Sequence, residues 1–223
     1  MSKRDYISEI ISKKERLKKR SPRWNQLSKR LVMLISLKQF ANQYTRRNKS
    51  IHKELPKYFP IGFVACIEGY FRLAIMDLIN HGKPFSDNAK KFKDYKFTVE
   101  HIIALQEKKV SYGELISHLL PLNGLDEIES TMSLIMGKSF LKELINTKTG
   151  NDEIFSGKSL EEVGKSNKLI SDINKLYELR HIFAHELAPS IIINTPEISS
   201  CSQAATVFMF LSETLISNIL TAP

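Results

Sequence analysis

The sequence predicts an all-α fold, an elongated bundle of about seven to nine helices, from three kinds of observation. Apolar residues recur at the three- and four-residue spacing of amphipathic helices over most of the chain. Residues that begin and end helices separate these stretches. No stretch shows a convincing β-hairpin signal. The chain has 223 residues, of which 42% are hydrophobic and 26% charged, and this is sufficient for one domain with a substantial core.

The N-terminal part is expected to form a short basic helix over residues 7–20 and then a much longer helix. Ser21 and Pro22 start the longer helix, because Ser is a good N-cap and Pro is a good first helical residue. The longer helix is expected to continue to about Glu54. Its inward-facing apolar residues are predicted to be Leu27, Leu31, Leu34, Ile35, Leu37 and Phe40.

The next expected helix covers residues 61–80 and is predicted to be central. Pro56 and Pro60 bracket a break before it, and Gly82 provides the stop signal after it. The apolar arc of this helix is wide, which is typical of an element that has neighbours on several sides. The polar stretch that follows, residues 83–97, is expected to be a long surface loop.

Shorter helices are expected in the middle of the chain. One covers residues 98–108, and the next begins at residues 111–114, where Ser and Glu have the spacing of a capping box. Residues 125–136 and 139–145 are predicted to form two more helices, separated by Gly137.

The C-terminal part is expected to hold the last two long helices. A loop over residues 146–157 and a short helical turn that starts at residues 159–162 come before the first of them. This first helix covers about residues 168–187. An irregular connector over residues 190–200 then leads to a final helix over residues 202–220.

Positive charge is concentrated at the N-terminus. Residues 1–60 hold 17 Lys and Arg against 4 Asp and Glu, a net charge of +13, whereas the remaining residues carry a net charge of −4. A basic arm indicates a nucleic-acid partner or, with less support, a membrane surface; the alternative is a solvated helix. We expect a basic helical segment over residues 1–54 and a helical domain over residues 55–223, unless the two are continuous.

The expected RNA-binding side chains lie in this basic segment. They are Lys13, Lys14, Lys18, Lys19, Arg20, Arg23, Lys29, Arg30, Arg46, Arg47 and Lys49. Trp24 and Tyr44 lie among these charges, where they would stack on bases. For Trp24, packing between two helices is the favoured interpretation.

The sequence indicates a cytoplasmic protein without a membrane partner. Cys66 and Cys201 lie in apolar helical stretches, and we expect buried thiols in a reducing compartment. The N-terminus lacks the apolar region of a signal peptide. The apolar runs over residues 61–79 and 204–220 contain charged residues, so neither is expected to span a membrane.

The most informative segment is Arg180-His181-Ile182-Phe183-Ala184-His185, near the end of the helix predicted over residues 168–187. Arg180 falls in the middle of the apolar stripe of that helix. A guanidinium there needs a carboxylate, a polar interface or an anionic ligand. His181 and His185 are one helical turn apart at the edge of the stripe, and two imidazoles beside an arginine favour a phosphate.

Glu68 is the second charge in an unexpected place, because it lies within the apolar arc of the helix over residues 61–80. A direct contact between Glu68 and Arg180 would satisfy both groups. The alternative interpretation of such a contact is a structural ion pair that fixes helix register, and the phosphate site is favoured over it. Arg72, one turn further on, is the alternative partner of Glu68.

An arginine and a histidine spaced R-x4-H in the penultimate helix of an all-α chain resemble the R-x4-6-H signature of the HEPN superfamily. The resemblance covers about residues 61–220, and the helices between Thr98 and Ile145 are an elaboration on it. It implies a HEPN-like core and a metal-independent endoribonuclease that needs no cofactor. Its catalytic residues would be Arg180, His185, His181 and Glu68.

In that chemistry a ribose 2′-OH attacks the adjacent phosphate, which gives a 2′,3′-cyclic phosphate and a 5′-OH. The resemblance implies that His185 is the acid or base, that Arg180 holds the phosphate and that His181 orients the substrate or His185. It also implies a homodimer with a composite active site and a role as a toxin or phage-defence effector. RNA would then be the substrate, and a cognate inhibitor or antitoxin would be a further partner.

Other interpretations stay open. One is a non-catalytic HEPN-like RNA-binding or scaffold module, and another is a regulatory partner of a nucleotidyltransferase-like protein. A metal site at His181 and His185, with Glu186 beside them, is disfavoured. The order of these residues differs from that of zinc proteases, and the sequence shows no third ligand nearby. We therefore expect no metal and no cofactor.

Overall fold

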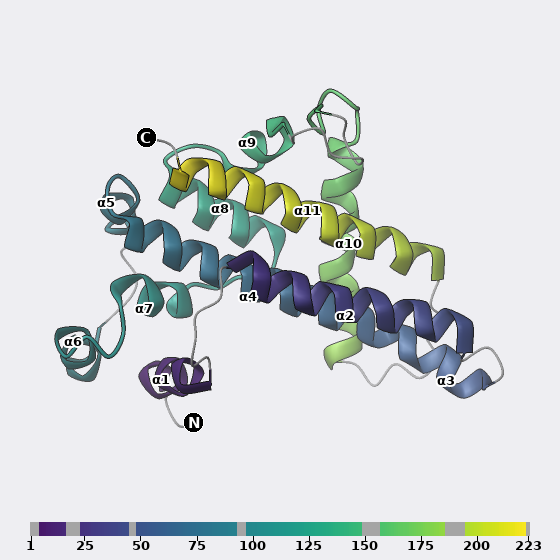
Figure 1. Ribbon diagram of the computed structural model, residues 1–223, viewed down its shortest axis with the longest axis horizontal. Helices are drawn as coiled ribbons and strands as arrows, with labels where there is room; N and C mark the ends of the chain where they lie inside the picture. Colours follow the sequence, from purple (N-terminus) through teal and green to yellow (C-terminus); the bar gives the residue numbers. More distant parts are fainter. Residues whose placement is uncertain are drawn as a thin grey trace.

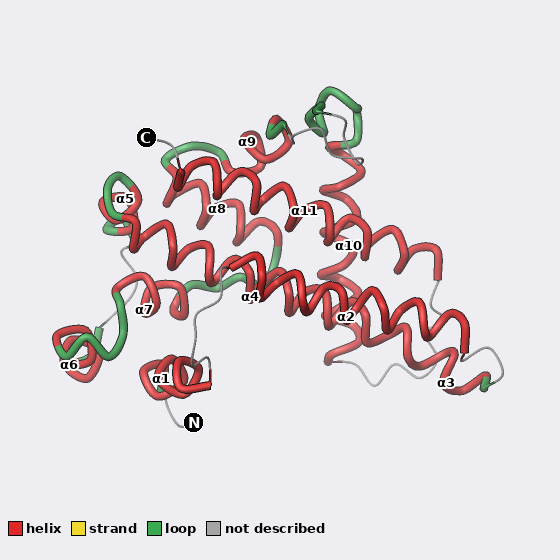
Figure 2. Tube along the Cα trace, viewed as in Figure 1, coloured by secondary structure: helices red, strands yellow, loops and turns green. Residues whose placement is uncertain are grey.

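A computed structural model describes residues 5–16, 23–44, 48–92, 97–148, 157–185 and 195–221. These residues form an all-helical structure without strands, which confirms the predicted fold class (Figures 1 and 2). Their helices, α1 to α11 with one 3-10 turn, are more numerous than the seven to nine expected.

Helix α4 (Tyr58–His81) is the central element, as the width of its apolar arc predicts (Figure 1). It contacts α2 (Arg23–Tyr44), α7 (Tyr112–Leu119), α10 (Ser166–His185) and α11 (Thr195–Thr221). Its side chains fill the middle of the main core, and several are completely buried. These include Phe63, Val64, Ile67, Phe71, Ala74, Ile75 and Leu78.

Helix α2 buries a narrower stripe than the sequence predicts. Leu27 and Leu31 are buried against α4, and Leu34 packs at the edge of the core. The prediction that Leu37 and Phe40 face inward is wrong, because they are 43% and 53% exposed. Ile35 is also exposed. The helices that contact α2, mainly α4 with further contacts from α11, cover only part of its circumference, so the outer part of its apolar surface stays open.

The join between α2 and α4 passes through α3 (Lys49–Glu54) and a 3-10 turn, η2 (Leu55–Lys57). The expected break at Pro56 therefore takes the form of this turn. The predicted extent of the break, from Pro56 to Pro60, is too long, because α4 begins at Tyr58 and Pro60 lies in its first turn. Proline is tolerated there, since the N–H groups of a first turn have no partner within the helix.

The expected loop over residues 83–97 contains a helix, α5 (Phe85–Ala89), so that prediction is partly wrong. Phe85 and Ala89 are buried, and α5 contacts α4 and α8 (Leu125–Met136). The polar composition around these two residues favours a loop, but their burial against α4 and α8 stabilises a helix instead.

The remaining helices follow their local start and stop signals. Helix α6 (Val99–Gln106) is capped by Thr98, and α7 has the predicted capping box. In this box the Ser111 hydroxyl accepts from the Glu114 N–H, and Oε2 of Glu114 accepts from the Ser111 N–H at 2.7 Å. Helices α8 and α9 (Phe140–Asn146) are separated at Gly137, where φ is 73°. At the C-terminus, α11 begins at Thr195 and so includes part of the expected connector.

The described part of the basic N-terminal segment contacts the rest of the protein. Helix α1 (Tyr6–Arg16) packs on α6 and α7 through a small separate cluster that contains Ile10, Ala104, Val110 and Leu115. Helix α2 packs on α4. The division of the chain near residue 54 stays a prediction.

Two stretches, Ser50–His81 and Pro196–Thr221, are long and apolar enough to cross a membrane by length and composition alone. Their most apolar windows are 61% and 44% buried inside the protein. The core helices of a water-soluble protein meet the same criteria, so these two stretches are weak evidence for a membrane.

Gly113 permits the close approach of α7 to α4. A Cβ at this position would lie 2.6 Å from the Met76 carbonyl oxygen and 2.7 Å from Oδ1 of Asn80. We expect Gly113→Ala to lower the free energy of unfolding by about 1–3 kcal/mol. Gly69→Ala in α4 is the control, since no atom lies within 4 Å of its added Cβ. This control should be neutral or stabilising by up to about 1 kcal/mol. Urea denaturation checks both values, and equal effects would contradict the expectation.

Candidate functional site

The candidate site is built on α10, whose inner face packs on α4, α8 and α11. The predicted apolar stripe is buried along most of the helix, at Leu169, Ile173, Leu176 and Tyr177. It becomes less buried toward the end, where Phe183 is partly buried and Ala184 is exposed. Arg180 lies at this transition, where an arginine side chain reaches both the core and the surface.

Arg180 and Glu68 are in direct contact, as one reading of the sequence predicts. Nη2 of Arg180 donates to Oε1 of Glu68 at 3.2 Å. The two side chains are 26% and 23% exposed, so the ion pair is only partly shielded from water. It joins α10 to α4, two helices that are far apart in the sequence.

The sequence offers Arg72 as the alternative partner of Glu68, but in the structure Arg72 donates hydrogen bonds to backbone carbonyls. Its Nη1 donates to the backbone carbonyl of Ser117 at 2.6 Å and approaches that of Leu120 at 3.3 Å. Arg72 therefore links α4 to the end of α7, where the last carbonyls of a helix lack partners within the helix. Its positive charge also acts on Glu68.

Glu68 lies in an environment that disfavours its ionised form. Burial raises the pKa of Glu68 above its ordinary value of 4.5, and the nearby Glu127 carboxylate acts in the same direction. The positive charges of Arg180 and Arg72 oppose this effect without cancelling it. Neither the sequence position of Glu127 nor its spacing indicates that it lies close to this pair.

The raised pKa gives a prediction with a definite sign. The folded state binds a proton on Glu68 more readily than the unfolded state, so this group lowers stability as the pH rises from below 4.5 through the raised pKa. We therefore expect Glu68→Gln to gain stability relative to the wild type over that interval. Urea denaturation at a series of pH values checks this, and an opposite trend would contradict it.

Tyr177 lies beside the ion pair and is a packing residue. It is buried, and its hydroxyl approaches the Leu122 carbonyl at 3.5 Å. Burial raises the pKa of Tyr177, and the carboxylate of Glu68 raises it further. A phenol in this environment stays protonated and is suited to hold the shape of the site.

The two histidines of the segment are described to different extents. His181 is exposed. The helical backbone of α10 continues through His185, so positions 181 and 185 are one turn apart and share a side of the helix. The side chain of His185, and Glu186 after it, lie outside the described residues.

Most of the predicted RNA-binding side chains also lie outside the described residues. These are Lys13, Lys14, Lys18, Lys19, Arg20, Arg46, Arg47 and Lys49. Lys29 and Arg30 are exposed on α2, which is compatible with a role in holding RNA.

Arg23 was expected on the RNA-facing surface, and the structure shows that this expectation is wrong. It is buried, with Nη1 2.8 Å from Oδ2 of Asp77 and Nε 2.6 Å from Oε2 of Glu213. The Tyr70 hydroxyl donates to the same Glu213 oxygen at 3.0 Å. Arg23 therefore joins α2 to α4 and α11 through two carboxylates.

Trp24 packs edge-on against Phe210 of α11, which confirms its favoured interpretation as a packing residue.

The cysteines and carboxylates of the described residues bear on two kinds of chemistry, metal binding and thiol reactivity. Within those residues no group of three His, Cys, Asp or Glu side chains is placed to hold a metal ion. Cys66 and Cys201 are buried free thiols, as predicted. Burial raises the pKa of both, to about 11 for Cys201, so neither is an activated nucleophile.

Comparison with known proteins adds no assignment: no family model, no curated protein and no solved structure matches this chain. The candidate site is therefore defined by its own residues. It consists of an arginine–glutamate pair across two core helices, with two histidine positions on the arginine's helix.

Proposed function

We propose that the protein is a metal-independent endoribonuclease of the HEPN type, with a HEPN-like core formed around α4, α10 and α11. The observation that carries this proposal is the partly exposed Arg180–Glu68 pair on the helix that bears the R-x4-H spacing. A histidine follows Arg180 directly, and a second occupies the next turn.

Arg180 retains the capacity to bind a phosphate. A guanidinium has five N–H groups, and among the described residues Glu68 is the acceptor for one of them. The side chain is 26% exposed, so an anion has access to the remaining donors. Glu68 would orient the guanidinium, which would then stabilise the charge that grows on the non-bridging oxygens in the transition state.

The reaction requires one group that removes a proton and one that supplies a proton. The base takes the proton of the ribose 2′-OH, whose oxygen attacks the adjacent phosphorus. The bond to the 5′-oxygen breaks as the acid protonates that oxygen, which gives a 2′,3′-cyclic phosphate and a 5′-OH. His185 would serve as acid or base, and His181 would orient it or the substrate. A second protomer would supply the complementary groups and make the active site composite.

The basic residues near the N-terminus would attract the RNA backbone, so binding should weaken steeply with salt. The biological role that accompanies this chemistry is that of a toxin or phage-defence effector in the cytoplasm. A cognate inhibitor or antitoxin would then control it.

One observation favours a second candidate, a non-catalytic RNA-binding or scaffold module. The Glu68 carboxylate neutralises Arg180 and ties α10 to α4, which is what a structural ion pair does. In a regulatory partner of a nucleotidyltransferase-like protein, the Arg180–Glu68 pair would likewise be structural and not catalytic.

Analysis of the reaction products separates these candidates. We expect the purified protein to cut RNA in excess EDTA and to leave 2′,3′-cyclic phosphate and 5′-OH ends. A protein that binds RNA without cutting it would support the module instead. Fragments with 5′-phosphate ends, or cleavage only with added metal, would exclude the proposed mechanism. Size in solution is an independent check, since a strict monomer would contradict a composite site.

A further inference from the structure

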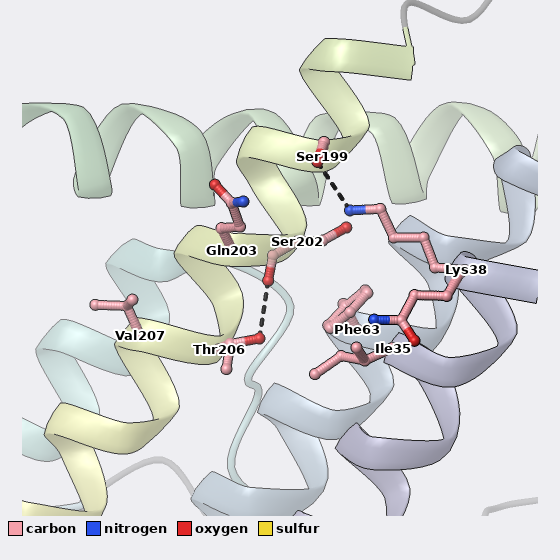
Figure 3. Close-up of a pocket in the computed structure, with 9 residues that line it drawn as sticks. Ile35, Lys38, Phe63, Ser199, Ser202, Gln203, Thr206 and Val207 are labelled. Carbon is pink, nitrogen blue, oxygen red and sulfur yellow. Dashed lines mark hydrogen bonds between the residues drawn. The ribbon is translucent and has the colours of Figure 1, made fainter. Parts of the chain in front are cut away.

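A pocket of about 410 Å³ lies between α2 and α11, with Phe63 of α4 among its walls (Figure 3). Its accessible apolar surface comes from Ile35 and Val207, whereas Phe63 borders the pocket but is itself completely buried. Gln203 and Lys38 add polar groups. None of the residues that line it belongs to the R-x4-H segment. A volume of this size is within the range of pockets that hold small organic molecules.

Lys38 is the charged group of this pocket, and no Asp or Glu is among the described residues that line it. Its Nζ donates to the Ser199 hydroxyl at 3.1 Å across the gap between α2 and α11 (Figure 3). No ion pair joins Lys38 to a carboxylate of the described residues. Burial lowers the pKa of Lys38, because part of the ammonium is removed from water. An anion beside Nζ would offset that cost.

The other hydroxyls of the pocket are already used within α11. The Thr206 hydroxyl donates to the Ser202 carbonyl at 3.0 Å, and the Ser202 hydroxyl donates to the Ile198 carbonyl at 2.6 Å. The Ser199 hydroxyl differs, because it accepts from Lys38 and donates to no acceptor among the described residues. Lys38 and Ser199 therefore offer two adjacent donors that match the two oxygens of a carboxylate.

We propose that this pocket binds an amphiphilic monocarboxylate, with the carboxylate on Lys38 and Ser199 and the apolar body against Ile35 and Val207. A single ammonium beside apolar walls suits one negative charge on a hydrocarbon body better than a multiply charged phosphate ester. The ligand would bridge α2 and α11, two helices that also enclose the main core. This proposal does not depend on ribonuclease activity.

Octanoate is the probe, and isothermal titration calorimetry measures its binding to the full chain. We expect saturable binding that Lys38→Met weakens by about tenfold or more, because a charge-assisted contact is lost. Lys38→Arg keeps the charge and should retain much of the affinity. Lys29→Met removes the same charge from an exposed position of α2 and should bind like the wild type.

Octan-1-ol tests whether the carboxylate is recognised, since it has the same hydrocarbon chain without the charge. Octan-1-ol should bind to the wild type more weakly than octanoate does. Its affinity for Lys38→Met should equal its affinity for the wild type. The proposal would be overturned if octanoate shows no saturable binding. Equal affinities of the Lys38→Met and Lys29→Met variants, both folded by thermal melting, would also overturn it.

Discussion

Replacement of Arg180 by alanine should lower the rate of RNA cleavage by about 10²–10³-fold, the usual cost of removing one preorganised donor from a transition state. The guanidinium is held by Glu68 at 3.2 Å and is still partly exposed to solvent. Arg180→Lys should recover only part of the rate, because an ammonium is a point charge without the planar fork that matches a phosphate. Single-turnover cleavage of a labelled RNA measures these rates.

Lys175→Ala is the matched control for this experiment. Lys175 lies on the same helix, and its partner Glu178 forms a surface pair with it at 3.1 Å. This variant should cleave RNA at the wild-type rate, since such pairs contribute little. Full activity in a folded Arg180→Ala protein would contradict the role given to the guanidinium.

Arg23→Met should produce the largest loss of stability. The variant leaves Asp77 and Glu213 without the guanidinium that neutralises both, and it leaves Tyr70 beside an uncompensated carboxylate. Breaking a fully buried ion pair costs about 3–5 kcal/mol, and we expect a loss near the lower end of this range. The side chains of Asp77 and Glu213 are 32% and 18% exposed, so water replaces part of the lost interaction, less at Glu213 than at Asp77.

Denaturation by urea measures this loss, with Lys29→Met as the control on the exposed side of the same helix. The control should change the free energy of unfolding by less than about 0.5 kcal/mol. If Arg23→Met were no less stable than this control, the cluster of Arg23, Asp77 and Glu213 would not hold α2 against the core.

The parts of the fold that depend on local signals were predictable from the sequence. The capping box at Ser111 and Glu114 and the left-handed Gly137 between α8 and α9 involve residues close together in the chain. Helix α5 was missed, because the burial of Phe85 and Ala89 depends on α4 and α8. The exposure of Phe40 was missed for the same kind of reason, since it depends on how many helices cover α2.

In the candidate site, too, features set by the pattern of one helix were predictable and features set by distant contacts were not. Glu68 and Arg180 were predictable as partners, because each is a charge on an otherwise apolar helix face. Arg23 was misassigned, because it lies in a run of basic residues and its partners are 54 and 190 positions away. The approach of Glu127 to Glu68 was likewise not predictable, because it depends on the packing of α8 near α4 and α10.

The most direct test of the proposed ribonuclease compares wild-type protein with His185→Ala in excess EDTA. We expect the wild type to cut RNA and the folded variant to leave it intact, with His81→Ala as a control outside the R-x4-H segment. Equal cleavage by wild type and His185→Ala, or loss of wild-type cleavage in EDTA, would contradict a metal-independent reaction at this segment.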